Sequence, residues 1–245
     1  MKPIRLALQS SAVAVCLMLA SQANAGVVTF SNILGTWFNA NPLANIDSNT
    51  GTSANAQVRW GGAANIANDS GYNFLASGTT SVTVPPPQGF TLGQFSHVNF
   101  PVGSSITGID LEIDAHVVVG VVDEGIKKFF FHFTHDETPN SPPCPYGPPG
   151  LTGINANGCA DKVSVNFLTT SDSFLVGSDL YTINILGFQQ GVGPLVTDFL
   201  TEEQAVNTAN LVGQVSLRSS IPEPGSIALV GLALFGLAAS RRRAS

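Results

Sequence analysis

The chain has 245 residues, of which only 11% are charged, and it contains 25 glycines and 15 prolines. This composition is typical of an extracellular β-protein and argues against a helical bundle, whose exposed faces normally carry Glu and Lys. Residues 26–220 contain 15 acidic and 5 basic residues, a formal net charge of −10. An acidic body without a basic patch repels phosphate backbones, which argues against nucleic-acid binding and leaves divalent cations and neutral glycans as easier partners.

The N-terminus has the pattern of a secretory signal. Lys2 and Arg5 precede an apolar run over residues 6–20, and small residues then lead to Ala25 and Gly26. A positive start, a short apolar core and a small-x-small exit predict cleavage between Ala25 and Gly26. The alternative is an uncleaved membrane anchor, but the run is shorter than the roughly 20 residues that a bilayer requires.

Two cysteines, Cys144 and Cys159, remain after removal of the signal. Export takes thiols out of the reducing cytosol, so this pair predicts a disulfide. A disulfide that closes their separation of 15 residues lowers the entropy of the unfolded chain and stabilises the fold by roughly 3 kcal/mol in the entropy model. Cys144 lies within a proline-rich stretch over residues 141–150, which disfavours helix and central strand. A zinc site is the alternative, but no adjacent pair of histidines supports it.

The C-terminus combines three features in a fixed order: the triplet Pro222, Glu223 and Pro224, an uncharged stretch over residues 227–240, and the cluster Arg241, Arg242 and Arg243. As a helix the uncharged stretch would span about 21 Å, against a hydrocarbon core of about 30 Å. We therefore expect a marginal transmembrane helix, with its arginines on the cytoplasmic side. The prolines keep the junction extended and open to cleavage. A permanent single-span anchor is the alternative.

This tail resembles the PEP-CTERM sorting domain of Gram-negative bacteria, with Ile221 in place of the usual valine. The resemblance implies recognition and cleavage by an exosortase, a transient stay in the inner membrane, release to the cell surface or the extracellular space, and an association with exopolysaccharide. The expected organisation is a signal peptide over residues 1–25, a body over residues 26–220 and a sorting segment over residues 221–245.

Short β-prone runs recur along the body between turn signals, at residues 57–60, 79–84, 106–122, 127–134, 162–169, 179–188 and 210–217. Regular short strands of this kind predict a single all-β domain, a β-sandwich of jelly-roll-like type. One short helix is expected near residues 201–211, because Thr201 can cap it and two glutamates follow in its first turn.

Three carboxylates alternate with apolar residues on one predicted strand, at Asp110, Glu112 and Asp114. Alternation puts all three on one face, at successive same-face positions roughly 7 Å apart. We interpret this row as the solvated side of a strand. A calcium site or an acid-catalytic pair is the alternative, although no calcium-binding loop accompanies the row.

A second group of polar residues, His132, His135, Asp136 and Glu137, follows a run of phenylalanines. The spacing suggests a metal site, yet a continuing strand points His132 and His135 to opposite faces. Hydrogen bonding within a turn by His135, Asp136 and Asn140 is the favoured interpretation.

A second resemblance rests on the segment Ser96-His97-Val98-Asn99, which is similar to the Thr-His-x-Asn segment of the choice-of-anchor type K domain. Supporting stretches lie at residues 58–61, 135–140 and 159–163. The resemblance implies a shared exported domain and no established activity.

His97 and Asn99 fall on one face of an extended segment, together with Phe95. They are our leading candidates for a surface site, and His135, Asp136 and Glu137 join them as candidate binding residues. A buried polar ladder that joins a loop to a sheet is nevertheless the favoured interpretation of His97 and Asn99.

No nucleophile elbow, phosphate-binding loop or dinucleotide fingerprint occurs, so we predict no catalytic residue, no metal ligand and no cofactor. A structural or adhesive surface protein is therefore the first hypothesis. The second is a lectin-like module that stacks glycans on the aromatic residues Trp37, Trp60, Tyr72 and Tyr146. The third is a metal-dependent hydrolase built on His97, His132, His135 and nearby acidic residues.

Overall fold

The computed structural model of the chain describes residues 26–84, 88–167 and 173–219. The predicted signal peptide and the predicted sorting segment with its transmembrane helix lie outside these residues. Among the described residues, no helix has the length and apolar character needed to cross a membrane.

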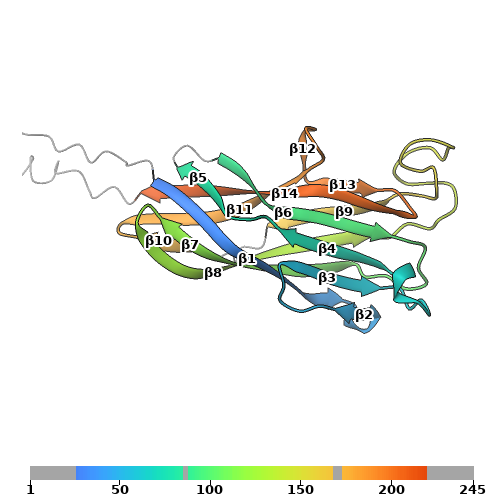
Figure 1. The fold of residues 1–245 in the computed structure, drawn as a ribbon. Coiled ribbons are helices and arrows are strands. Elements are labelled where there is room, and N and C mark those ends of the chain that lie inside the picture. Colours follow the sequence, from blue (N-terminus) through green and yellow to red (C-terminus); the bar gives the residue numbers. More distant parts are fainter. Residues whose placement is uncertain (1–25, 85–87, 168–172, 220–245) are drawn as a thin grey trace, which may run out of the picture.

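The described chain is built almost entirely from strands (Figure 1). In the first half these are β1 (Gly26–Asn41), β2 (Ile46–Asn49), β3 (Asn55–Trp60), β4 (Ser70–Ala76), β5 (Thr80–Val84), β6 (Gln88–Asn99) and β7 (Gly108–Val119). In the second half they are β8 (Val122–Asp136), β9 (Asp161–Phe167), β10 (Ser173–Val176), β11 (Asp179–Gln189), β12 (Leu195–Val196), β13 (Asp198–Thr201) and β14 (Ala205–Ser219). Two short 3₁₀ helices, η1 (Leu43–Asn45) and η2 (Ile66–Asn68), lie in loops.

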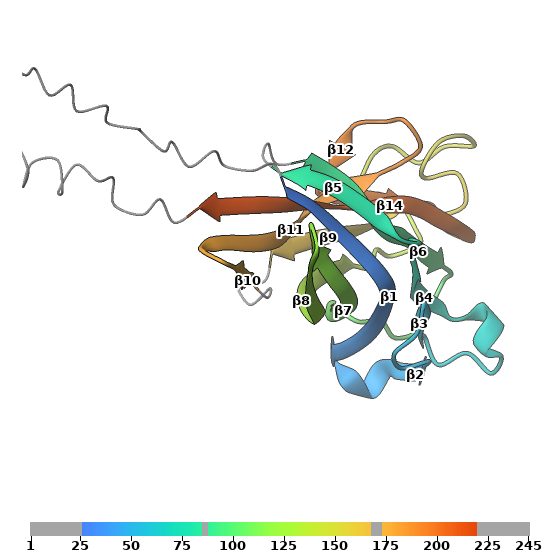
Figure 2. The same ribbon diagram turned by 60° about the vertical axis from the view of Figure 1, so that its left-hand side comes forward.

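The strands form two curled antiparallel sheets that enclose one core (Figure 2). Sheet A has the order β13-β9-β8-β7-β1-β5, and sheet B has the order β10-β11-β14-β6-β4-β3-β2, with β12 beside β11. The all-β, sandwich-like fold predicted from the sequence is confirmed.

Alternation along β7 and β8 creates the inner face of sheet A. Ile113 of β7 pairs with Phe129 of β8 and Leu111 pairs with Phe131, and all four side chains are buried. Each such side chain stabilises the fold by roughly 1.5–3 kcal/mol relative to an exposed one. Continuous apolar burial at every second residue therefore fixes which face of these strands points inward.

The outward side chains of the same two strands form the predicted carboxylate row. The Lys128 ammonium lies 2.5 Å from a Glu112 carboxylate oxygen and 3.0 Å from one of Asp114, while the His132 Nδ1 atom lies 2.6 Å from Asp110 Oδ1. Basic side chains on β8 thus face and pair with the carboxylates of β7. The row is a solvated strand face, as the alternation indicated.

Strand β1 was not predicted, because two irregularities interrupt its alternation. Its pairing with β7 shifts register between Ser31 and Leu34 and again between Phe38 and Asn41. Asn32 and Asn39 sit at these shifts with φ angles of 50° and 51°, in the left-handed region that asparagine tolerates. Each bulge reverses the phase of the pattern, so no single period covers the strand.

The helix expected near residues 201–211 is wrong. Strand β13 ends at Thr201, a tight turn follows in which Gln204 has a φ of 57°, and β14 begins at Ala205. Residues 205–215 pair with β6 on one side, and residues 210–219 pair with β11 on the other. Two ladders of backbone hydrogen bonds outweigh a weak local preference for helix.

The loop between β8 and β9, residues 137–160, is closed by the predicted disulfide between Cys144 and Cys159, whose Cα atoms are 5.0 Å apart. In Figures 1 and 2 this loop lies at one end of the sandwich, whereas β1 begins and β14 ends at the opposite end. We call residues 137–160 the β8–β9 loop.

Candidate functional site

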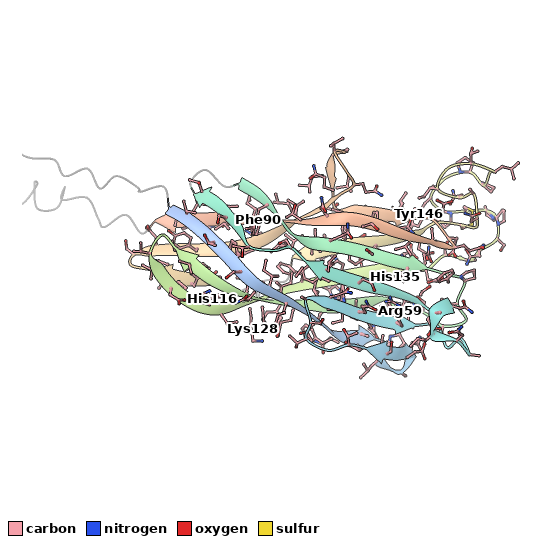
Figure 3. All side chains as sticks on the ribbon, in the orientation of Figure 1. Arg59, Phe90, His116, Lys128, His135 and Tyr146 are labelled. Atoms are coloured by element: carbon pink, nitrogen blue, oxygen red, sulfur yellow. A yellow bond between two sulfur atoms is a disulfide. The ribbon has the colours of Figure 1, made fainter. Side chains whose placement is uncertain are left out.

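Five ionisable residues gather between the two sheets next to the β8–β9 loop, and we call them the polar cluster: His97, His135, Glu137, Asp161 and Glu203. His97 belongs to β6, His135 to β8 and Asp161 to β9, while Glu137 and Glu203 lie in the loops that follow β8 and β13. His97, Asp161 and Glu203 are 0% exposed and His135 is 5% exposed. His135 lies toward the end of the sandwich that carries Tyr146 of the β8–β9 loop (Figure 3).

Strand alternation carries these side chains inward. His97 is two residues from the buried Phe95, His135 is two residues from the buried Phe133, and Asp161 precedes the buried Val163 by the same interval. Each ionisable group therefore continues an apolar face toward one end of its strand. The register pairs His135 directly with Val163, which brings β8 and the start of β9 together at this end.

The two nitrogens of His97 have different surroundings. Its Nδ1 atom lies 2.8 Å from Thr201 Oγ1, and the Thr201 hydroxyl in turn donates to the Asp161 carbonyl oxygen at 3.4 Å. The tautomer that carries its proton on Nδ1 donates to Thr201 and leaves the Nε2 lone pair free. The buried Nε2 atom has no hydrogen-bond partner within the described residues. Burial lowers the pKa of His97 well below its usual range, with His135 adding to the effect, so the ring stays neutral.

His135 is held on both sides of its ring. The Tyr72 hydroxyl lies 2.6 Å from Nδ1, and Glu137 Oε2 lies 3.2 Å from Nε2. The ring is perpendicular to that of His97, with centroids 5.1 Å apart. Trp60 covers both rings, at 5.4 Å from His135 and 6.1 Å from His97. Aromatic walls therefore fix the orientation of both imidazoles.

The carboxylates of Asp161 and Glu203 are poorly compensated. Asp161 Oδ1 accepts the Thr138 backbone N–H at 2.7 Å, but Oδ2 and both Glu203 oxygens have no well-aligned hydrogen bond within the described chain. Burial raises the pKa of Asp161 to about 7, and the Glu137 charge adds to it. Burial likewise raises the pKa of Glu203 to about 7, with Asp161 and Glu137 contributing and the nearby Asn140 side chain opposing the rise.

The polar cluster contains two overlapping sets of three ligand atoms, and each set is compact enough to hold a cation. One ligand atom each from His97, His135 and Asp161 lie within 4.8 Å of one another, and so do one each from Glu137, Asp161 and Glu203. Asp161 belongs to both groups. Imidazole nitrogens and carboxylate oxygens in one place are the donors that divalent metal ions use in proteins.

The β8–β9 loop and the turn after β13 enclose the polar cluster. The Asn157 side chain donates to Glu202 Oε1 at 2.9 Å, and the Gln204 side chain donates to the Asn157 carbonyl at 3.0 Å. Gly158 has a φ of 147°, and a Cβ atom there would lie 2.8 Å from Glu203 Cγ. A glycine at this position lets the loop close over the Glu203 side chain.

His97 and Asn99 are not the candidate surface site, since both side chains are 0% exposed. The favoured interpretation, a buried polar ladder, describes them: the Asn99 amide donates to the Thr201 carbonyl at 3.3 Å, beside the His97 contact with the same residue. His135 is also buried, in a strand rather than a turn. Asp136 is exposed and accepts a hydrogen bond from the Tyr146 hydroxyl.

His132 and His135 point to opposite faces of β8, as alternation predicted, so they do not form one site. Sequence reasoning missed Asp161 and Glu203 as members of a site. The position of Asp161 could have been predicted from the sequence, because Asp161 lies on the same strand face as the buried residues Val163 and Val165. The position of Glu203 could not, since its inward direction depends on the turn between β13 and β14.

Three of the four aromatic residues proposed for glycan stacking are buried, with Trp37 at 1% and Trp60 and Tyr72 at 0% exposure. They cannot present a ring to a sugar. The fourth, Tyr146, has the Lys162 ammonium 5.2 Å from the centre of its ring.

The comparison with protein families concerns the tail. A family model for the PEP-CTERM protein-sorting motif matches residues 220–243. The chain carries this sorting motif. The match includes Pro222, Glu223, Pro224 and the three arginines at 241–243 that sequence analysis singled out. The PEP-CTERM tag marks an exported protein that is handled at the membrane and processed by an exosortase. No match to the chain is found among curated proteins.

Proposed function

We propose that the chain is a structural or adhesive protein of the cell surface or extracellular matrix, without catalytic activity. In this proposal an exosortase cleaves the tail after a transient stay in the inner membrane, and the released body acts among exopolysaccharide. The body is a domain of the choice-of-anchor type K.

The observation that carries this proposal is the position of the sorting motif relative to the body. Strand β14 ends at Ser219, and the matched motif begins at residue 220. The chain therefore leaves the sandwich at the end opposite the β8–β9 loop (Figure 1). A body delivered by this tail carries the disulfide-closed loop at its distal end, where it is free to meet a matrix or a neighbouring cell.

The enclosed state of the polar cluster supports a role without catalysis. A catalytic group must reach its substrate, and His97, Asp161 and Glu203 are completely buried. The lectin-like alternative loses three of its four aromatic residues to the core.

Deletion of residues 221–245 from the full chain tests the sorting step in a host that has an exosortase. We expect the truncated protein to lose surface display, and the intact protein to be recovered with a new C-terminus near Pro222, measured by surface labelling and intact mass. A matched control removes only residues 244–245, which lie outside the matched motif. Unchanged surface display of the truncated protein would refute the proposal.

A further inference from the structure

The polar cluster contains buried atoms that the described protein leaves unsatisfied. His97 Nε2 and Asp161 Oδ2 have no hydrogen-bond partner among the described residues, and neither carboxylate oxygen of Glu203 has a well-aligned one, although the Asn140 side chain and the Gln204 N–H lie near that carboxylate. An unpaired buried polar atom normally costs about 1–3 kcal/mol, and more if it is charged. Native proteins seldom bury several such atoms together unless something binds there.

All the unpaired atoms of this set are electron-pair donors, and their surroundings are acidic. Three carboxylates, those of Glu137, Asp161 and Glu203, have ligand atoms within 4.8 Å of one another. No lysine or arginine in the described ranges forms a salt bridge with any of them. A cation would satisfy the unpaired atoms and neutralise the carboxylates at once.

We propose that the polar cluster binds one divalent transition-metal ion of the zinc class. His97, His135 and Asp161 are three of its ligands. The fourth is a carboxylate oxygen from Glu137 or Glu203. The ion has a structural role, and this metal site is independent of the proposed function at the cell surface.

The donor set selects the class of metal. Two imidazole nitrogens suit zinc and its neighbours in the first transition row, whereas calcium and magnesium prefer sites made of oxygen atoms alone. Tetrahedral ligands at 2.0–2.2 Å from zinc are about 3.4 Å apart, so atoms within 4.8 Å of one another would need to approach by at most about 1.4 Å. Both cysteines that could have offered thiolates are joined in the disulfide.

Three neighbouring groups already orient the three ligands. Thr201 Oγ1 lies 2.8 Å from His97 Nδ1 and leaves Nε2 free, and the Tyr72 hydroxyl lies 2.6 Å from His135 Nδ1, with His135 Nε2 directed toward Glu137 Oε2 at 3.2 Å. The Thr138 N–H, at 2.7 Å, holds Asp161 Oδ1 and leaves Oδ2 free. Metal sites characteristically use such outer hydrogen bonds to fix the tautomer and the direction of each ligand.

The placement of the ligands makes the ion a cross-link between the sheets. His97 comes from β6 of sheet B, while His135 and Asp161 come from β8 and β9 of sheet A. Glu137 is the exposed edge of the cluster, with 20% of its side chain accessible, and marks the route by which an ion enters. A site closed on its other sides has no open position for a substrate, as expected of a structural metal.

Metal analysis of the exported full chain, purified without chelator, is the first test. We expect about one zinc-class ion per chain. Chelator-treated protein should then bind added Zn²⁺ with a rise in Tm, and Asp161→Asn, which keeps the acceptor for Thr138, should weaken Zn²⁺ binding at least about 100-fold. The matched control is His132→Gln, on the outer face of the same strand as His135, which should change the Kd less than twofold.

Four outcomes would overturn the proposal: less than 0.2 ion per chain with no Zn²⁺ binding on titration, two ions per chain, preference for Ca²⁺ over Zn²⁺, or unchanged binding by Asp161→Asn. If Asp161→Asn does not fold, the wild-type protein decides the matter by nuclear magnetic resonance. Added Zn²⁺ must then shift the His97 Nε2 signal, and a shift confined to the half-buried His116 and His132 rings on the outer face of sheet A would refute the site.

Discussion

The molecule has two sets of three carboxylates, one on each side of sheet A, and they have opposite surroundings. The outer set, Asp110, Glu112 and Asp114, faces His132 and Lys128 at 2.5–3.0 Å. The inner set, formed by the acids of the polar cluster, has no facing lysine or arginine salt bridge within the described residues and includes three buried oxygens without a well-aligned hydrogen bond. The outer set is conspicuous in the sequence, whereas the inner set is scattered along it.

This difference shows that whether a group of carboxylates requires a bound cation depends on solvent access more than on the number of acidic residues. Water and nearby cations neutralise an exposed carboxylate, and surface ion pairs contribute only about 0–1 kcal/mol. A buried carboxylate without a cation is costly, so its retention in a core points to a bound partner. Three substitutions would test the contrast between the two sets.

Loss of the disulfide should have the largest effect. In the double variant Cys144→Ser and Cys159→Ser, the 15-residue separation is no longer closed, which lowers the free energy of unfolding by about 3 kcal/mol. The loop also covers the polar cluster through the contacts of Asn157. Urea unfolding measures the change, and reduction of the wild-type protein should reproduce it. A loss below about 1 kcal/mol would show that the loop is ordered without the disulfide.

Thr201→Val should have an intermediate effect on the buried set. Valine matches the shape of threonine but removes the hydroxyl that contacts His97 Nδ1 at 2.8 Å. Leaving that buried donor unpaired should cost about 1–3 kcal/mol in urea unfolding. Thr182→Val is the matched control, because its hydroxyl bonds Ser173 on the outer face of β11. Equal effects of the two variants would contradict the distinction between a buried and a solvated polar group.

Glu112→Gln should have the smallest effect, in the outer set. It weakens one contact of Lys128, which keeps its contact with Asp114 at 3.0 Å. We expect a loss of about 0.2–1 kcal/mol that shrinks in high salt, because surface pairs are screened. Unfolding at low and high ionic strength measures it. A loss above about 2 kcal/mol, unchanged by salt, would show that the outer row is a structural network rather than a solvated face.

Alternation in the sequence was sufficient to predict strands such as β7 and β8, where buried apolar residues recur at every second position from Ile109 to Val119 and from Phe129 to Phe133. It failed for β1, whose bulges at Asn32 and Asn39 reverse the phase, and for the first part of β14, where Glu202 and Glu203 suggested a helix. Local patterns report on strands only where the pairing is regular. Bulges and turns depend on what the neighbouring strands require.

The sequence by itself determined the export signal pattern, the sorting motif at the C-terminus, the all-β class and the disulfide pair, because each depends on local composition, order or spacing. Only the tertiary structure decided that His97, His135, Glu137, Asp161 and Glu203 share one site. These residues come from strands of both sheets and from two loops, and their separation along the chain reaches more than a hundred residues. Strand register and sheet packing, which no local pattern encodes, bring them together.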